Sequence, residues 1–242
     1  AIKATFADDK HDYPSDQPGY GFAGWMSDSS QVLAYSKYDI WAFNVNTNQA
    51  KRLTNGKQTN TQYRVIKLDR NQVGFKQDET LLVTAVDLQT KQRGIAKLDL
   101  ENTTITEVLS GDKRFDIVKK AKKADKYLFT EQSYHQFPDF YQTDLSFLTT
   151  QKVTDLNPQT ANFAWGEKPE LISYKGFDGE DLQGVLIKPD GYKKGDKVPV
   201  VVYFYRYMSQ RMFDFPKMEL NHRPNFPMFT SNGYAIFLPD IR

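Results

Sequence analysis

The sequence predicts a mainly β protein in which a partial β-propeller of about three four-stranded blades precedes the first strands of an α/β sheet. Two observations predict this fold. Short strand-like segments recur in sets between residues 20 and 156, with polar turns between them, as in propeller blades. From about residue 170 the strand-like segments become longer and more apolar, as in a sheet that helices cover.

The expected blades are recognised by their middle strands, which begin at residues 40, 95 and 140. The repeat predicts three strands in each of three sets, namely Val32–Tyr35, Ile40–Phe43 and Lys51–Thr54, then Leu81–Thr84, Ile95–Leu98 and Ile105–Leu109, then Tyr127–Thr130, Phe140–Thr143 and Lys152–Thr154. Tyr63–Leu68 and Phe115–Val118 are the expected inner strands of the second and third sets. Three blades are too few to close a ring, so we expect further blades before residue 1.

Residues 157–169 separate the two parts of the chain. This connection contains two prolines and a glycine, which are typical of a loop. We therefore predict two domains. Residues 1–160 are the C-terminal blades of a propeller, and residues 161–242 are a linker and the first strands of a second, incomplete domain.

Composition excludes several classes of function. The 242 residues carry 32 basic and 30 acidic side chains, a balance that argues against a protein built to bind nucleic acid or an anionic membrane. Cysteine is absent, which excludes disulfides, thiolate catalysis and Cys-based metal sites. No apolar run reaches the length of about eighteen residues that a membrane-spanning helix needs. The N-terminal segment is not a signal peptide and lacks an initiator Met, so we expect a processed chain or a piece of a longer one.

Four groups of side chains invite a functional interpretation, but packing or solvation explains each group better. They are the polar cluster Asp8, Asp9, His11 and Asp12, the basic run Lys119, Lys120, Lys122 and Lys123, the tryptophans Trp25, Trp41 and Trp165, and the loop residue His135. A metal site needs ligands that converge from several elements, and the basic run has no interleaved aromatic residues. The tryptophans are expected near blade cores and His135 at the surface. We therefore predict no metal site and no cofactor.

The second part begins with a hairpin. Leu171–Tyr174 and Leu182–Lys188 are strand-like, and the Asp-Gly pair between them is a strong turn signal. Val200–Tyr205 is a continuous β-branched and aromatic run, which predicts a central strand buried on both faces. A short helix over 227–231 and a strand over 234–238 follow, so we expect a parallel strand–helix–strand unit.

Three stretches of this part carry a more specific pattern: Ile172–Pro189 with its Asp-Gly hairpin, Lys197–Tyr205, and Asn232–Arg242 with its terminal Asp-x-Arg. Together they resemble the beginning of the catalytic domain in the prolyl oligopeptidase family, which includes dipeptidyl peptidases and acylaminoacyl peptidases. Members of this family join a β-propeller to an α/β-hydrolase domain. The resemblance covers about residues 170–242 and implies that these stretches form the first strands of an α/β-hydrolase sheet.

The resemblance implies a catalytic role for Tyr205, at the end of the third hydrolase strand. Its phenol would donate a hydrogen bond to the oxyanion of the tetrahedral intermediate. The family continues this tyrosine with Gly-Gly-Pro or Ala-Gly-Pro, whereas Arg206-Tyr207-Met208 follows here. This departure leaves Tyr203 and Tyr207 as alternatives for the donor.

The sequence contains no Gly-x-Ser-x-Gly, and in α/β-hydrolases the Ser, Asp and His of the triad come after the strands found here. Ser209 and His222 lack the required context. We therefore expect the triad to lie outside the chain and the chain alone to be inactive. The favoured function is a piece of a serine peptidase that hydrolyses oligopeptides behind a gating propeller. The alternative is a non-catalytic propeller protein for binding or scaffolding, with a degenerate hydrolase segment.

The resemblance also bears on partners and location. The expected partner is an oligopeptide substrate, with no nucleic acid and no membrane span. A homodimer of the full-length protein is compatible with the resemblance, and a periplasmic or extracellular location is favoured by it. Cleavage specificity depends on residues outside these stretches, because the chain has no Glu-Glu pair of the kind with which dipeptidyl peptidases bind a free N-terminus.

Overall fold

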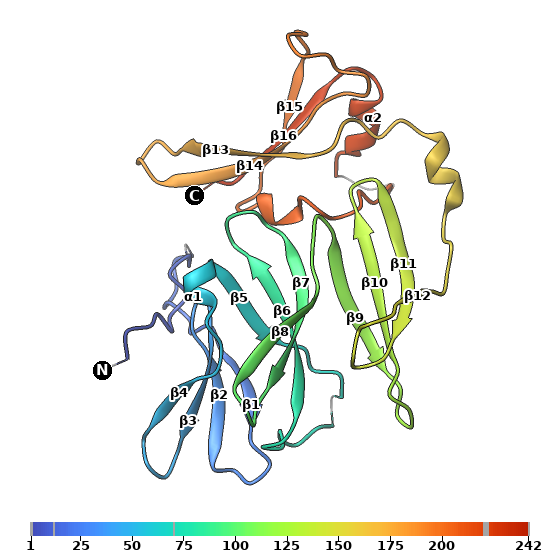
Figure 1. Cartoon of the computed structure of the whole chain (residues 1–242). Coiled ribbons are helices and arrows are strands. Elements are labelled where there is room, and N and C mark those ends of the chain that lie inside the picture. Colours follow the sequence, from blue (N-terminus) through green and yellow to red (C-terminus); the bar gives the residue numbers. More distant parts are fainter. Residues whose placement is uncertain (1, 12, 70, 220–222, 242) are drawn as a thin grey trace. The chain divides into compact units, whose positions relative to one another are not determined.

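The computed structural model of the chain describes residues 2–11, 13–69, 71–219 and 223–241, so Asp12 and His222 lie outside the described residues. Strands dominate these residues and form four four-stranded sheets (Figure 1). The helices found in them are short, namely α1 (Gly56–Thr59), α2 (Phe226–Thr230) and the 3-10 helices η1 (Pro158–Asn162) and η2 (Ser209–Arg211). The predicted mainly β architecture is confirmed.

Three of the sheets are meanders in which each strand pairs with the next one along the chain. Their strands are β1 (Phe22–Trp25), β2 (Gln31–Tyr35), β3 (Ile40–Asn44) and β4 (Ala50–Arg52); β5 (Thr61–Val65), β6 (Thr80–Asp87), β7 (Arg93–Asp99) and β8 (Thr104–Leu109); and β9 (Arg114–Lys120), β10 (Tyr127–Ser133), β11 (Gln136–Thr143) and β12 (Gln151–Lys152). They include every strand that the repeat predicted, and four-stranded meanders are consistent with propeller blades.

The second sheet illustrates why these residues form strands. Its strand β6, TLLVTAVD, is rich in Val and Thr, which favour extended backbone. Its neighbour β7, RGIAKLD, carries few such residues and adds Ile95 and Leu98 to the buried face. The residues of β6 and β7 are all buried or half-buried, whereas none in the edge strand β8 is fully buried. The first two sheets share one apolar core, whose buried members are Ala23, Met26, Leu33, Ile40, Ala42, Leu53, Phe75, Leu81, Val83, Ala96, Leu98 and Leu100.

A buried aspartate closes the first sheet. Asp39, which immediately precedes β3, is 3% exposed. Its carboxylate accepts hydrogen bonds from the Thr54 hydroxyl (2.8 Å) and the Gly56 amide (2.5 Å), and the Thr54 hydroxyl oxygen accepts one from the Ile40 amide (3.0 Å). We call this arrangement the Asp–Thr clamp. It ties the start of β3 to the chain that leaves β4.

The third sheet contains the same clamp. Asp139 accepts from the Thr154 hydroxyl and the Leu156 amide, both at 2.8 Å, and the Phe140 amide donates to the Thr154 hydroxyl (2.9 Å). In both sheets the threonine lies fifteen residues after the aspartate. The second sheet has Gly94 at the matching place, directly before the first residue of its predicted middle strand. The clamp is therefore a feature of two blades of the three.

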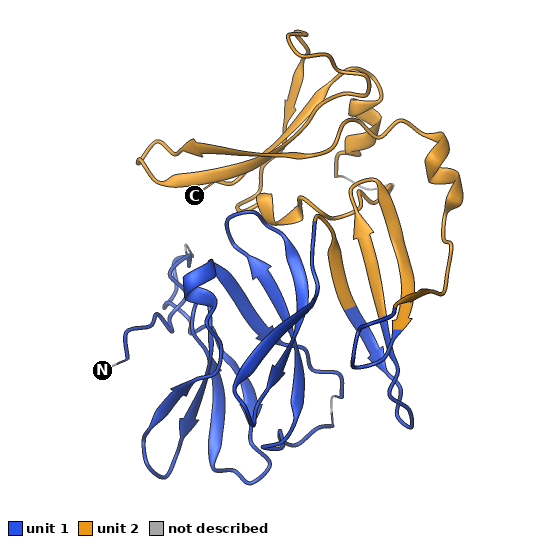
Figure 2. Cartoon of the chain, in the orientation of Figure 1, with its two compact units in different colours: residues 1–111, 117–128, 143–149 blue, residues 112–116, 129–142, 150–242 orange. Residues whose placement is uncertain are grey.

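Backbone contacts divide the chain into two compact units (Figure 2). One unit consists of residues 1–111, 117–128 and 143–149, and the other of residues 112–116, 129–142 and 150–242. The third sheet is thus shared between the units, while the fourth sheet lies wholly in the second unit. The predicted domain boundary at residue 160 stays a prediction.

The fourth sheet consists of β13 (Glu170–Lys175), β14 (Asp181–Ile187), β15 (Val200–Val202) and β16 (Ala235–Pro239) in the order β13-β14-β16-β15. β13 and β14 form the predicted antiparallel hairpin. β15 and β16 pair in parallel, with α2 between them in sequence. The predicted strand–helix–strand unit is confirmed, and the helix begins one residue before its predicted start.

Two glycines allow this sheet to form. Gly179 lies in the hairpin turn with φ of +84°, a left-handed conformation that favours glycine. Gly184 lies in β14 opposite Pro239, where a Cβ atom would come within 2.8 Å of the Phe237 ring. A larger residue at position 184 would therefore push β14 away from β16.

The prediction that Val200–Tyr205 is buried on both faces is wrong for the described residues. The strand ends at Val202, and Val200 and Val202 are 51% and 52% exposed. Val201 and Tyr203 pack against the core of the second unit, so only one face of the strand is covered. The physical reason is that successive side chains of a strand point to opposite faces, and among the described residues only the face of Val201 and Tyr203 packs against a core.

The Asp–Thr clamp predicts a stability effect in the first sheet. Asp39→Ala leaves the buried amide of Gly56 without its acceptor, and should lower the free energy of unfolding by about 2–4 kcal/mol. Urea denaturation of the chain measures this loss. The control is Asp28→Ala, which removes an exposed turn aspartate that bonds only Ser30 and should cause a much smaller loss. Equal losses in the two variants would contradict the clamp.

The clamp of the third sheet predicts a pH dependence. Burial alone would raise the pKa of Asp139, but bonds from the Leu156 amide, the Lys152 ammonium and the Thr154 hydroxyl hold it below its ordinary value of 3.8. The folded chain therefore binds this proton more weakly than the unfolded chain. Asp139 stabilises the fold above about pH 4, and its contribution is lost as the pH falls below that value.

Asp139→Asn should accordingly make the melting temperature less sensitive to acid. We expect the drop in Tm between about pH 6 and pH 3 to be smaller in the variant than in the wild type. Thermal denaturation followed by circular dichroism at several pH values measures it. The same drop in both proteins would show that Asp139 is not a source of the acid sensitivity.

Candidate functional site

The candidate site lies where the chain leaves β15. The last backbone bond of this strand to β16 is donated by the Tyr203 amide to the Phe237 carbonyl (3.0 Å). The chain then bends at Tyr205 and Arg206 and enters η2 at Ser209. We call residues 203–209 the β15 loop. It leaves the carboxyl end of a parallel strand, the edge at which α/β sheets commonly bind their ligands.

The three tyrosines of the loop differ in their surroundings. Tyr203 packs against the core of the second unit, with its ring 5.6 Å from that of Phe226 in an edge-to-face contact. Tyr207 is half-buried. The Tyr205 side chain is 69% exposed, and none of the described residues forms a hydrogen bond with its hydroxyl. Tyr205 is therefore the loop tyrosine whose phenol is most open to an external acceptor.

Arg206 has an unusual backbone conformation. Its φ is +54°, in the left-handed region where a residue with a side chain pays about 1–2 kcal/mol. Glycine adopts this conformation without that cost. The loop thus keeps a bend of the kind glycine favours although an arginine occupies the position. The surrounding structure therefore has to hold Arg206 in its left-handed conformation.

Asp240 holds the second half of the loop. This residue follows β16 directly and is 5% exposed. One carboxylate oxygen accepts hydrogen bonds from the amides of Met208 (2.6 Å) and Ser209 (2.8 Å). The other oxygen accepts one from the Ser209 hydroxyl (2.6 Å). A carboxylate at this depth needs such donors, because an unpaired buried charge is costly.

Ser209 is therefore an anchoring residue. Its side chain is buried at 2% exposure and its hydroxyl proton is directed to Asp240. Asp240 is the aspartate of the Asp-x-Arg at the end of the resembling stretches, a pattern that assigns it no role, and its contact with Ser209 spans 31 positions in the chain. No local signal could have found it.

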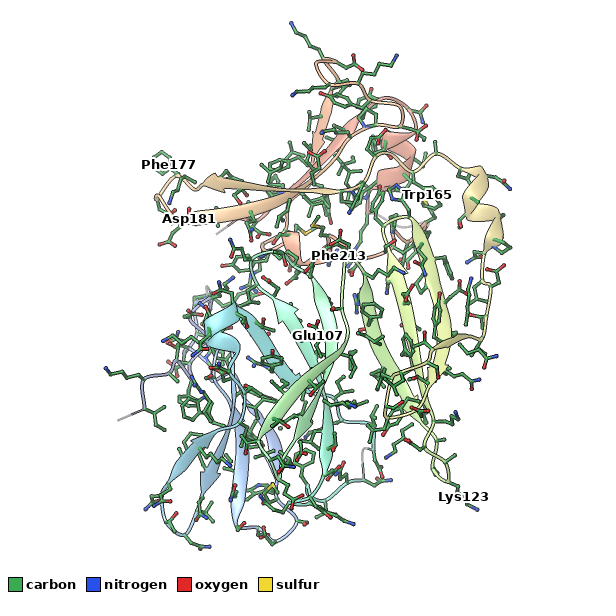
Figure 3. The ribbon with its side chains drawn as sticks, in the orientation of Figure 1. Glu107, Lys123, Trp165, Phe177, Asp181 and Phe213 are labelled. Atoms are coloured by element: carbon green, nitrogen blue, oxygen red, sulfur yellow. The ribbon has the colours of Figure 1, made fainter. Side chains whose placement is uncertain are left out.

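Beyond η2 the chain packs against one end of the third sheet, within the same unit. The Phe215 amide donates to the Gln132 side chain (3.0 Å), and Asp214 forms an ion pair with Arg114 (2.9 Å). The Phe215 ring lies 5.0 Å from that of Trp165 and 5.2 Å from that of Phe137. The side chains of Trp165 and Phe213 are labelled in Figure 3. The segment from Ser209 to Phe215 is thus fixed at its start by Asp240 and at its end by the third sheet.

The connection before β13 is fixed as well. The Tyr134 hydroxyl (3.0 Å) and the Thr230 hydroxyl (2.9 Å) both donate to the Trp165 carbonyl. Nε2 of His135 lies 2.8 Å from the Gly166 carbonyl. Burial raises the pKa of the Tyr134 phenol, so it remains a proton donor. His135 is exposed, as predicted, and its contact is with backbone.

The other residues that the sequence singled out have partners of different kinds. Asp9 pairs with Lys37 (2.6 Å) and accepts from the Tyr20 hydroxyl (2.6 Å), while Nε2 of His11 bonds the Ser15 hydroxyl (2.9 Å). Burial tends to raise the pKa of Asp9, but its bonds to Lys37 and Tyr20 outweigh this and lower it. These side chains do not converge on one point. No group of three or more His, Asp and Glu residues in the described chain could hold a metal ion.

The basic run and the tryptophans are placed as follows. The lysines of the basic run are exposed, as predicted, but Lys119 and Lys120 end strand β9, and only Lys122 and Lys123 lie in the turn before β10 (Figure 3). Trp41 contacts Phe6 at 5.9 Å and Trp165 packs in the second unit. The expected core position of Trp25 is wrong, because 45% of this residue is exposed: Ala23 and Met26, rather than Trp25, are the buried residues of this segment.

None of the helices in the described part of the chain is long and apolar enough to cross a bilayer.

Comparison with known proteins adds a similarity in fold. No family model and no curated protein sequence matches the chain. Among solved structures, Porphyromonas gingivalis dipeptidyl peptidase 4 matches 89% of this chain and 30% of its own, with 15% identity and a TM-score of 0.62. A puromycin-hydrolyzing peptidase of Mycobacterium tuberculosis matches 90% of this chain and 33% of its own, with 12% identity and a TM-score of 0.58. Pyrococcus horikoshii acylaminoacyl peptidase matches 95% and 34%, with 17% identity and a TM-score of 0.51.

At this level of identity the matches concern the fold alone. The chain resembles the β-propeller part of prolyl oligopeptidase-family peptidases. It spans about a third of the length of the structures it matches. No catalytic triad is evident in the sequence.

The left-handed conformation of Arg206 predicts how the loop responds to substitution. Arg206→Gly removes the conformational cost, whereas Arg206→Val keeps a β-branched residue where φ is positive. Both variants lose the guanidinium group, so their comparison isolates the backbone effect. Arg206→Val should be less stable than Arg206→Gly by about 1–2 kcal/mol in urea denaturation. Equal stability would mean that the loop relaxes out of this conformation.

Proposed function

We propose that the chain is part of a serine peptidase of the prolyl oligopeptidase type, which hydrolyses peptide bonds of oligopeptides. In this proposal the three meanders are propeller blades, and the fourth sheet is the beginning of an α/β-hydrolase domain. The observation that carries it is the exposed phenol of Tyr205 at the carboxyl end of β15, next to the parallel strand β16. The serine, aspartate and histidine of the triad belong to the full-length protein, outside this chain.

The extent of the structural matches supports the proposal. They cover 89–95% of this chain, more than residues 1–160 alone could supply, so they extend into the second predicted domain. The neighbours are named as dipeptidyl peptidase 4 and acylaminoacyl peptidase. The antiparallel hairpin followed by a parallel strand–helix–strand unit is the arrangement that the family resemblance implied for residues 170–242.

The proposed chemistry gives Tyr205 one task. A serine hydroxyl attacks the peptide carbonyl and its proton passes to the histidine, while negative charge builds on the carbonyl oxygen. The Tyr205 hydroxyl donates a hydrogen bond to this oxygen and stabilises it more in the tetrahedral intermediate than in the ground state. A donor fixed before the reaction needs no reorganisation during it, so the conformation of the β15 loop affects kcat more than KM.

The propeller would act as a filter in this enzyme. Blades that surround the access to a peptidase site admit short, flexible peptides and exclude folded proteins. The specificity for a particular residue or a blocked end is not assigned to this chain.

Tyr205→Phe in the full-length protein tests the assignment. The variant keeps the ring and loses the donor, so kcat on a chromogenic oligopeptide should fall about a hundredfold or more. KM should change little, because the lost bond is formed mainly in the transition state. Steady-state kinetics at several substrate concentrations separates the two constants.

Tyr203→Phe and Tyr207→Phe are the matched controls, since each removes one phenol from the same loop. Both should retain kcat. A large loss in either one, with Tyr205→Phe unaffected, would move the donor to that position. Full-length protein without a Gly-x-Ser-x-Gly motif and without peptidase activity would overturn the proposal in favour of a binding or scaffold protein.

A further inference from the structure

Asp240 connects the loop that carries Tyr205 to the centre of the fourth sheet. Its own backbone is held by the sheet, because its amide donates to the Gln183 carbonyl (2.8 Å) and its carbonyl accepts from the Tyr174 hydroxyl (2.5 Å). Gln183 belongs to β14 and Tyr174 to β13. Asp240 also follows β16 directly, so three strands together fix the backbone from which its carboxylate projects.

The β15 loop is tethered to this one place from both sides of Tyr205. Before it, the Tyr203 amide donates to Phe237 of β16 (3.0 Å). After it, the Ile241 amide donates to the Arg206 carbonyl (2.9 Å), and the Asp240 carboxylate accepts from Met208 and Ser209. Every one of these tethers leads to β16 or to the two residues that follow it.

Of these tethers, the Asp240 carboxylate makes the largest number of hydrogen bonds to the loop. It makes three hydrogen bonds, all from donors of the loop, and all away from water. Hydrogen bonds to a charged acceptor in such an environment are stronger than those between neutral groups. They also oppose the left-handed strain at Arg206, which would otherwise be relieved by a shift of the loop.

We propose that Asp240 is a positioning residue for Tyr205: its carboxylate fixes the β15 loop in the conformation that presents the phenol to the oxyanion. Asp240 touches neither substrate nor the reacting atoms in this proposal. It rests on the proposed function, because positioning matters for the reaction only if Tyr205 is the donor. The proposal adds to the proposed function a residue that acts on Tyr205 through the loop.

The first test is kinetic and uses the full-length protein. Asp240→Ala should lower kcat by about tenfold to a hundredfold with KM little changed, since a small displacement of a catalytic group has a large effect on rate. Asp240→Asn should retain most of the activity. Its amide oxygen can still accept from both backbone amides, and its NH2 group can donate to the Ser209 hydroxyl.

A double-variant comparison separates positioning from general stability. If Asp240 acts through Tyr205, Asp240→Ala should have little further effect on kcat once Tyr205→Phe has removed the donor. The control is Asp139→Ala, which removes an equally buried aspartate of the third sheet. It should lower stability and leave kcat unchanged. The same loss of kcat from Asp240→Ala in both backgrounds, or no loss at all, would overturn the proposal.

The second test reads the loop directly and does not need activity. Trypsin cleaves after arginine, so the rate of cleavage after Arg206, measured by mass spectrometry, reports how firmly the loop is held. Asp240→Ala should accelerate this cleavage and leave cleavage after the exposed Lys123 unchanged. If Asp240→Ala does not fold, Asp240→Ser, which keeps one short acceptor, replaces it with the same expectation.

The outcomes distinguish the two proposals. If Asp240→Ala leaves cleavage after Arg206 unchanged while Tyr205→Phe strongly lowers kcat, Asp240 is excluded as a positioning residue and the assignment of Tyr205 stands. No effect of Tyr205→Phe on kcat would remove the proposed function, and with it the catalytic role of Asp240, even if cleavage after Arg206 is accelerated.

Discussion

A carboxylate that is buried away from water must be surrounded by donors, and Asp240 meets this requirement with the loop that follows β15. The constraint acts in both directions. The loop supplies two amides and a hydroxyl that would otherwise be buried without acceptors, and the carboxylate supplies the charge that holds them. Because β16 carries Asp240 and also pairs with β15, the strand and its loop are fixed by the same neighbour. The exposed position of Tyr205 depends on this arrangement.

The same chemistry organises the blades. Asp39 is buried directly before β3 and Asp139 within β11, and each accepts from a threonine and a backbone amide beyond the outer strand. A two-residue strand such as β12 has few ladder bonds of its own. A side-chain clamp that reaches past it compensates for this shortness. The second sheet, whose outer strand β8 has six residues against three in β4 and two in β12, has Gly94 in place of the aspartate.

Sequence reasoning succeeded where the determining interactions are local. The recurrence of short strand-like segments between polar turns predicted the strands of the three meanders except β1, and the Asp-Gly turn predicted the β13–β14 hairpin. It failed for β15, because an apolar run says that a strand could be buried but not what covers it. Val200 and Val202 are exposed since they point to the face of β15 opposite to Val201 and Tyr203, which pack against the core. Trp25 was placed in the core for a similar reason, from its residue type alone.

The sequence by itself determined the meander strands other than β1, their grouping into sets, the parallel unit of β15 and β16, and the presence of three tyrosines at its end. Each of these follows from spacings of a few residues. Only the tertiary structure decided which tyrosine is open, that Arg206 adopts a left-handed conformation, and that Asp240 and Ser209 hold the loop. These features depend on contacts between residues about thirty positions apart, and pairing over such a distance is set by how the strands order in the sheet, which no local pattern encodes.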